Sequence, residues 1–217
     1  MKLIVIEGSG DGVGKTTQFN LIKQELEKEY KVITHHFPSY NKDQGKLVEN
    51  YLKGEYGTPD TINPYLSNSM YAIDRAITMN EIKTLQTKDT IILLDRYTTS
   101  SLIYQSAYLN DEEKNKFIDF VTEYEYNKLQ IPKPDVVIFL HIPYEISKKL
   151  RDNRKENEGI SKDIHETDLS FMKKVYDSSI FVSNKLNFDT IECINNGELR
   201  SIEDINKEIM IKIRKKI

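Results

Sequence analysis

The segment at residues 6–18, IEGSGDGVGKTTQ, constrains the fold more than any other part of the chain. A short apolar run at 3–7 precedes it, and a segment with helical apolar spacing follows at about 15–29. A glycine-rich turn between a strand and a helix lets backbone N–H groups converge on an anion, and the dipole at the helix N-terminus also favours negative charge. The sequence therefore predicts a phosphate-binding loop in an α/β fold.

The glycine spacing in this loop departs from the usual pattern, in which a glycine and four further residues precede Gly-Lys-Ser/Thr. Counting back from Gly14, the first glycine would stand at position 9, where the chain has Ser9. Neighbouring glycines give the backbone several ways to absorb an added residue, so we interpret the loop as functional. Lys15 is expected to reach the β- and γ-phosphates of ATP, and the Thr16 hydroxyl to bind Mg²⁺. The expected ATP-binding residues are Gly8, Ser9, Gly10, Asp11, Gly12, Val13, Gly14, Lys15, Thr16 and Thr17.

Composition narrows the class of protein. The chain has 217 residues, 38% hydrophobic and 30% charged, which predicts one globular domain over 1–217. The net charge of −3 argues against a general nucleic-acid coat, and apolar runs no longer than VVIFL argue against a membrane span. The opening MKLIVIEG runs directly into a strand, which argues against a signal peptide. Cys193 is the only cysteine, so no intrachain disulfide is expected and a cytoplasmic location is favoured.

Strand and helix patterns alternate along the chain. Apolar runs typical of buried strands occur at 3–7, 31–37, 91–95, 135–142 and, more weakly, 190–194, with helical patterns between them. This order predicts an α/β fold with a five-stranded parallel sheet covered by helices on both faces. Ligands in such folds bind beyond the carboxyl ends of the strands.

The charged segment at 151–163, RDNRKENEGISKD, has almost no apolar periodicity. It is either a solvated loop or a lid over the phosphate site.

A second group of polar residues follows the third predicted strand, in LLDRYTTSSLIYQ at 93–105. Asp95 would stand at the strand end, where a carboxylate can associate with Mg²⁺. Arg96 can grip a phosphate with two N–H groups. The next polar side chains fall at helical spacing and can line one side of a pocket: Ser100, Ser101, Tyr104 and Gln105. The alternative is an ordinary helix start in which Asp95 pairs with Arg96.

Five stretches occur in the order and approximate spacing found in thymidylate kinases: EGSGDGVGKTTQ, FPSY at 37–40, MYAIDR at 70–75, DRYTTSSLIYQ at 95–105 and IPKPDVVIFL at 131–140. The chain resembles this family over nearly its whole length. The resemblance implies a P-loop NTPase architecture with a short lid. It also implies transfer of the γ-phosphoryl of ATP to dTMP with Mg²⁺, in dTTP biosynthesis, by a homodimer. The alternatives are a deoxynucleoside kinase, whose third-strand motif typically begins Glu-Arg-Ser, and a P-loop ATPase or switch protein that binds a partner.

The resemblance also implies roles at the nucleotide acceptor site. Tyr71 would stack on thymine and Arg75 would hydrogen-bond a thymine carbonyl. Tyr104 would pack under the sugar, Asp11 would meet its 3′-hydroxyl, and Arg96 would hold the 5′-phosphate. The full expected dTMP set is Asp11, Phe37, Pro38, Tyr40, Tyr71, Arg75, Arg96, Ser100, Ser101, Tyr104 and Gln105.

Expected catalytic residues are Lys15, Arg96, Asp11 and two lid arginines on the ATP phosphates, Arg151 and Arg154. Asp163 and Glu166 match an acidic pair that helps to close the lid. Many relatives have an arginine shortly after the Phe-Pro turn, and this chain has none there, so Arg96 is expected to do more, helped by Lys15 or Lys46. Asp11 keeps the family's offset to Lys15, which places the added residue earlier and predicts a small bulge at Ser9-Gly10. The four histidines have no spacing typical of a metal site, so structural roles are expected for them.

Overall fold

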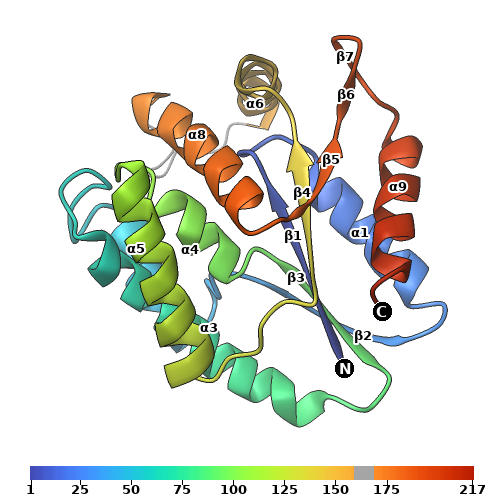
Figure 1. The fold of residues 1–217 in the computed structure, drawn as a ribbon, viewed down its shortest axis with the longest axis horizontal. Coiled ribbons are helices and arrows are strands. Elements are labelled where there is room, and N and C mark those ends of the chain that lie inside the picture. The colour runs from blue at the N-terminus through green and yellow to red at the C-terminus, as the bar shows by residue number, and fades with distance from the viewer. Residues whose placement is uncertain (159–168) are drawn as a thin grey trace.

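The computed structural model describes the backbone of residues 1–158 and 169–217, and the side chains of the same residues except 151, 153–158 and 169. Strands and helices alternate through most of it (Figure 1). The strands are β1 Lys2–Gly8, β2 Lys31–His36, β3 Thr90–Asp95, β4 Val136–His141, β5 Asp189–Glu192, β6 Ile194–Asn195 and β7 Glu198–Leu199. The helices are α1 Lys15–Leu26, the 3₁₀ turn η1 Asp43–Gly45, α2 Lys46–Leu52, α3 Pro64–Leu85, α4 Thr98–Tyr104, α5 Asp111–Val121, the π-helix η2 Thr122–Lys128, α6 Tyr144–Glu158, α8 Leu169–Lys185 and α9 Ile202–Arg214.

The predicted five-stranded parallel sheet is confirmed, with strand order β2-β3-β1-β4-β5. Strand β1 lies at the centre and pairs with β3 on one side and β4 on the other. The chain leaves β1 for β2 and β3 and later crosses to β4, so a crevice is expected beyond the carboxyl end of β1. The glycine-rich loop lies at this end, between β1 and α1.

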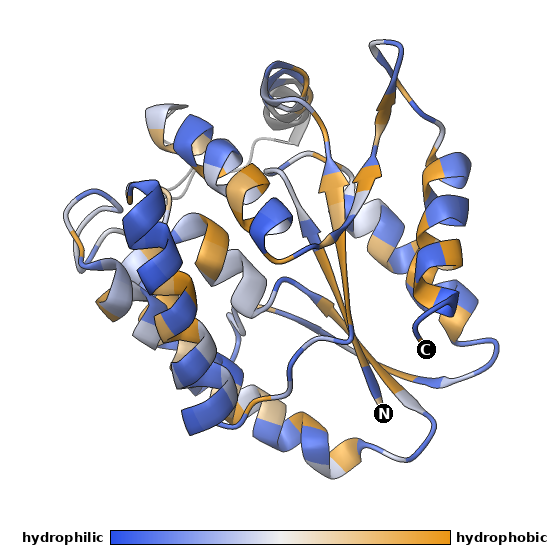
Figure 2. Cartoon of the chain, viewed as in Figure 1, coloured by the Kyte–Doolittle hydropathy of each residue, from blue (hydrophilic) through white to orange (hydrophobic). Residues whose placement is uncertain are grey.

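Alternate residues of the central strand face opposite layers of helices. Ile4 and Ile6 pack with Ile22 of α1 and Ile209 of α9, whereas Leu3 packs with residues of α3. Figure 1 shows α1 and α9 on one face of the sheet and α3, α4, α5 and α8 on the other. Figure 2 shows apolar strands between helices whose outer faces are hydrophilic. This arrangement explains why the strands read as near-continuous apolar runs.

Side chains at the helix starts fix where several helices begin. Asn63 accepts hydrogen bonds from two backbone N–H groups at the start of α3, Asn110 and Glu113 form a reciprocal capping box on α5, and Ser201 caps α9. Helix α1 has no such side-chain cap, so the free N–H groups of its first turn face the glycine-rich loop.

Two parts of the fold differ from expectation. Residues 151–158 continue helix α6, so the interpretation of that part of the charged segment as a loop was wrong. Lysine, arginine and glutamate favour helix without needing an apolar face. The remainder of the expected lid lies outside the described residues. The short antiparallel pair β6–β7 was not predicted, because two-residue strands leave no periodic signal. No helix in the described ranges is long and apolar enough to cross a bilayer.

The turn after β2 leaves no room for a side chain at Gly45. A Cβ there would lie 2.1 Å from the carbonyl oxygen of Ser39. We therefore expect Gly45→Ala to displace this turn and lower the free energy of unfolding by about 1–3 kcal/mol. Urea unfolding measures the change. Gly10→Ala is a matched control, because a Cβ at Gly10 meets nothing within 4 Å. Equal unfolding midpoints for Gly45→Ala and the wild type would contradict the prediction.

Candidate active site

The glycine-rich loop leaves β1 without disturbing its pairing. The ladder with β4 is regular to Gly8, and the Ser9 N–H continues it by donating to the Leu140 carbonyl at 2.9 Å. The Ser9 hydroxyl donates to the carbonyl of Ile142 at 3.0 Å and accepts from the Ile142 N–H at 3.1 Å. The expected bulge therefore does not interrupt the strand. The added residue is accommodated at Ser9, whose hydroxyl bonds to the backbone of Ile142 just after β4.

Two glycines give the loop its curvature. Gly12 and Gly14 have φ values of 82° and 85°, in the left-handed region that other residues enter at a cost. Gly8 is needed for a different reason, because a Cβ there would lie 2.5 Å from the Val13 side chain. The loop therefore ends at the uncapped start of α1, the geometry that binds phosphate oxygens.

The Lys15 side chain lies back over this loop. It is 9% exposed, and its ammonium is 3.3 Å from the carbonyl oxygen of Gly10 and 3.5 Å from a carboxylate oxygen of Asp11. The cation thus stays within the loop. Thr16 and Thr17 are exposed on the first turn of α1.

Arg96 follows the last residue of β3 in a left-handed conformation, with φ 65°. Its guanidinium hydrogen-bonds Asp11 of the glycine-rich loop and lies over the Tyr104 ring, 5.1 Å from the ring centroid. Burial alone would lower the pKa of Arg96, but Tyr104, Asp11 and Glu7 together raise it well above its usual value. Arg96 pairs with Asp11 and not with Asp95, which excludes the simple pairing of adjacent residues.

Glu7 is a buried carboxylate that the sequence reasoning missed. It accepts hydrogen bonds from the hydroxyls of Thr99, at 3.0 Å, and Ser100, and from the Gly8 N–H at 3.2 Å. One of its oxygens lies 3.9 Å from the Arg96 guanidinium. Glu7 therefore joins the central strand to the start of α4. A charged residue at the end of an apolar strand was the available signal.

Asp95 has one carboxylate oxygen near His36, at 3.1 Å from its Nδ1, and one buried oxygen without a partner among the described residues. Burial raises the pKa of Asp95. The hydrogen bond from His36 and the charge of Lys15 lower it by more than burial raises it, so the net shift of the pKa is downward. An ionised carboxylate with a spare oxygen fits Mg²⁺, which takes one or two carboxylates beside phosphate and water ligands. The described residues contain no group of three or more His, Cys, Asp or Glu side chains that could hold a metal alone.

A cleft opens beside Arg96. All eleven residues expected to bind dTMP line it, together with Leu52 and Tyr97. The structure therefore brings together residues from the glycine-rich loop, the turn after β2, helix α3 and the segment 96–105 that contains α4, although their individual roles stay predictions.

The turn after β2, which lines the cleft, is fixed by hydrogen bonds to Asp95 and Asp74. The Phe37–Pro38 peptide bond is cis, and the Phe37 N–H donates to the Asp95 carbonyl at 3.1 Å. Buried Asp74 accepts from the Ser39 N–H at 2.8 Å. This turn places Tyr40 at the cleft, with its ring stacked near that of His36.

Arg75 also lines the cleft and is 1% exposed. It donates to both carboxylate oxygens of Glu125 at 2.7 Å and to the Ser101 hydroxyl at 2.9 Å. Burial lowers the pKa of Arg75, but the carboxylate of Glu125 outweighs it, so the net shift is upward. Glu125 and Asn68, which accepts from Arg75 at 3.3 Å, were not predicted.

The remaining expectations have separate outcomes. Lys46 does not reach the cleft: its ammonium pairs with Asp43, its side chain is 68% exposed, and it was wrongly expected to help Arg96. The side chains of Arg151 and Arg154, and all of Asp163 and Glu166, lie outside the described residues.

Comparison with known proteins then gives the family. The model of the family described as thymidylate kinase matches residues 6–209. The chain belongs to the thymidylate kinase family. It is similar to a probable thymidylate kinase 1 from Saccharolobus solfataricus, with 35% identity over 88% of each chain. It is also similar to a thymidylate kinase from Prochlorococcus marinus, with 33% identity over 99% of each chain. A solved thymidylate kinase from Candida albicans has the same fold, with a TM-score of 0.73 at 22% identity over 99% of this chain and 91% of that one.

Proposed function

We propose that this thymidylate kinase family member transfers the γ-phosphoryl of ATP to the 5′-phosphate of dTMP, giving ADP and dTDP. The observation that carries the proposal is the cleft between Arg75 and Arg96, which opens beside the glycine-rich loop. In this proposal Arg75 meets the base and Arg96 meets the acceptor phosphate. A nucleoside monophosphate has these two ends.

The proposed mechanism uses position and charge. An oxygen of the dTMP 5′-phosphate attacks the γ-phosphorus in line, and ADP leaves. Lys15 stabilises the negative charge that spreads over the transferred group, while Arg96 holds the acceptor phosphate against the loop. No strong general base is needed, because a phosphate monoester is largely ionised at neutral pH.

Asp95 and the Thr16 hydroxyl are the residues that would hold Mg²⁺. When bound, the ion neutralises charge on the transferred phosphates. The unpartnered oxygen of Asp95 supports this assignment.

Deoxynucleoside kinases are the nearest alternative, and they must activate a neutral hydroxyl with a carboxylate. In this cleft the carboxylate is Asp11, which bonds to both Arg96 and Lys15. A carboxylate held by two cations is a weak base, which favours the monophosphate as acceptor. ADP release measured with dTMP and with thymidine decides between them. Turnover of thymidine without turnover of dTMP would overturn the proposal, and ATP turnover that needs neither would favour a P-loop ATPase.

Arg75→Ala is expected to raise the KM for dTMP by about a hundredfold while the KM for ATP changes by less than about threefold. The reason is that Arg75 lines the cleft next to Ser101 and lies in α3, away from the glycine-rich loop. Steady-state kinetics with each substrate varied in turn measure both constants. Equal losses for the two substrates would refute the assignment of Arg75 to the base.

A homodimer also stays a proposal. Three apolar side chains of α3 are exposed and lie on one face at helical spacing: Leu66, Ile73 and Ile77. Such a face is a natural surface for a second copy of the chain. Sedimentation equilibrium that gave the mass of one chain would contradict it. A cytoplasmic location is also a proposal. It is supported by Cys193, a free thiol in the core, because a reducing compartment keeps thiols free.

A further inference from the structure

Arg75 and Glu125 form a buried ion pair between α3 and the π-helix η2. Arg75 is 1% exposed and Glu125 is fully buried. The two groups meet in a bidentate arrangement, with Nε and Nη2 of Arg75 each 2.7 Å from a different carboxylate oxygen. The Thr98 hydroxyl donates to the same carboxylate at 3.3 Å. Bringing two charges into the core is unfavourable unless each is well bonded, so a buried ion pair is weak evidence for added stability. We therefore looked for a functional role of this pair.

The donors of Arg75 are unevenly used. Nε and Nη2 bond to Glu125, and Nη2 also contacts Ser101 and Asn68. Nη1 makes no hydrogen bond within the part of the chain that the structure describes, and Arg75 lines the cleft. A guanidinium has only donors. Nη1 is therefore the edge left for an acceptor atom of the ligand.

Glu125 does not line the cleft, so it acts on a ligand only through Arg75. Its place in the sequence fits this role. The buried residues of α5 are Lys114, Phe117, Ile118 and Val121, and Glu125 falls one turn further along the same face. Glutamate thus occupies a position where the pattern calls for an apolar residue. A π-helix at such a position is frequent near functional sites.

We propose that Glu125 is a positioning residue that holds Arg75 and balances its charge, so that this end of the cleft selects the neutral 4-oxo group of a pyrimidine over a 4-amino group. The inference rests on the proposed function, because it takes the ligand to be a pyrimidine monophosphate. A 4-amino group would point its N–H at the N–H of Nη1, and an unpaired buried donor disfavours binding. The Glu125 carboxylate fixes which edge of Arg75 is presented and removes the net charge that would otherwise attract an anion.

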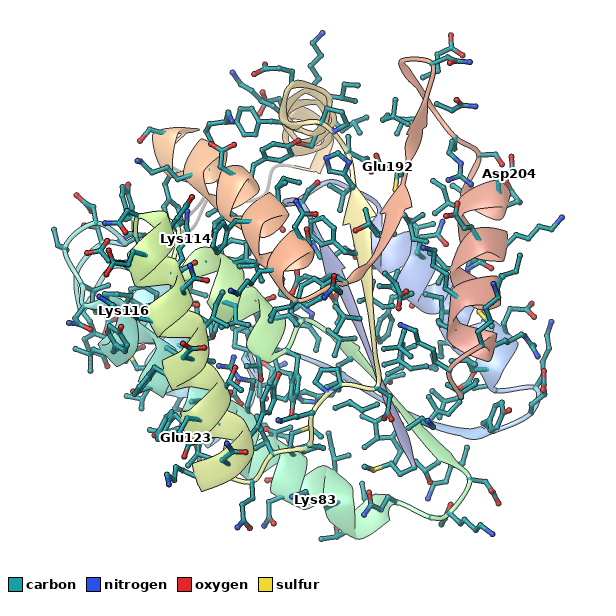
Figure 3. All side chains as sticks on the ribbon, in the orientation of Figure 1. Lys83, Lys114, Lys116, Glu123, Glu192 and Asp204 are labelled. Carbon is teal, nitrogen blue, oxygen red and sulfur yellow. The ribbon has the colours of Figure 1, made fainter. Side chains whose placement is uncertain are left out.

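The test measures Kd for dTMP and for dCMP by titration calorimetry in the Glu125→Gln variant. Glutamine keeps one acceptor but sets an amide N–H against the guanidinium. We expect the Kd for dTMP to rise about tenfold or more while that for dCMP changes by less than about threefold, so the ratio between them falls. At saturating dTMP, kcat stays within about threefold, and the KM for ATP is unchanged. Glu123→Gln is the matched control, since Glu123 lies on the same π-helix with its side chain 53% exposed (Figure 3).

Two further variants separate positioning from support of the fold. In an Arg75→Ala background, Glu125→Gln is expected to change the Kd for dTMP by less than about twofold, because nothing remains to be positioned. Should Glu125→Gln not fold, Glu125→Asp keeps the charge and withdraws it by one methylene, and an intermediate fall in the ratio is expected. An unchanged ratio of dTMP to dCMP affinity in a folded Glu125 variant, or equal losses for dTMP and ATP, would overturn the inference. A wild-type protein that binds dTMP but transfers no phosphoryl group to it would instead refute the proposed function, and the affinity ratio would still test Glu125.

Discussion

Lys15→Met is expected to lower kcat for dTMP phosphorylation by about a thousandfold, which corresponds to about 4 kcal/mol of transition-state stabilisation. Lys15 is the cation of the glycine-rich loop, and among the described residues its ammonium makes two long contacts, to Gly10 at 3.3 Å and to Asp11 at 3.5 Å. It is therefore free to move onto a phosphate as charge develops there. Methionine preserves the length and the apolar stem of the side chain, so the fold should be kept.

An ADP-release assay at saturating ATP and dTMP measures this loss. Lys23→Met is the matched control, because Lys23 lies on the same helix and its side chain is 40% exposed. It should retain wild-type kcat. A Lys15→Met protein with more than about a tenth of wild-type kcat would show that Lys15 is not the main phosphate cation.

Arg96→Lys is expected to lower kcat/KM for dTMP by about a hundredfold to a thousandfold, although the charge is kept. The guanidinium presents donors in a fixed plane, and here that plane lies over the Tyr104 ring and bonds Asp11. An ammonium cannot grip a phosphate with two parallel bonds. The effect should be large because this chain has no arginine shortly after the Phe-Pro turn and the Lys46 ammonium pairs with Asp43.

The comparison for Arg96 is Arg214→Lys, a substitution in an exposed arginine that pairs with Glu29. Initial rates over a range of dTMP concentrations, at fixed ATP, give kcat/KM for each variant. The control should match the wild type. If Arg96→Lys kept more than about a fifth of wild-type kcat/KM, another group would have to hold the acceptor phosphate.

Sequence patterns predicted the parts of the fold that repeat a physical period. The five strands of the main sheet were found because strands buried on both faces are apolar throughout. The β6–β7 pair was missed because its strands are too short to show a period, and the charged end of α6 was missed because its sequence has almost no apolar periodicity. The bulge expected at Ser9-Gly10 followed from counting residues, which cannot reveal that the Ser9 hydroxyl bonds to the end of β4.

The candidate site divides in the same way. Residues that line the cleft stand in local motifs, and all eleven that were expected there are present. Glu7, Asn68 and Glu125 lie behind those residues and bond to them, and no single motif contains any of the three together with the side chain that it bonds. Glu125 was detectable in principle, as a charged residue on the apolar face of a helix. Identifying its partner, fifty residues earlier in the chain, required the structure.

Position 96 combines backbone strain with the proposed acceptor-phosphate grip. A side chain in the left-handed region costs about 1–2 kcal/mol, and Arg96 has φ 65°. Glycine would relieve that strain, but the fold would lose the guanidinium that bonds Asp11 and lies 3.9 Å from the buried carboxylate of Glu7. A library screened only for survival on heating would therefore weigh relief of strain against loss of these ion pairs, and its outcome at position 96 would not report turnover. The strain is stored in the residue that is proposed to hold the acceptor phosphate, as backbone strain often is at functional sites.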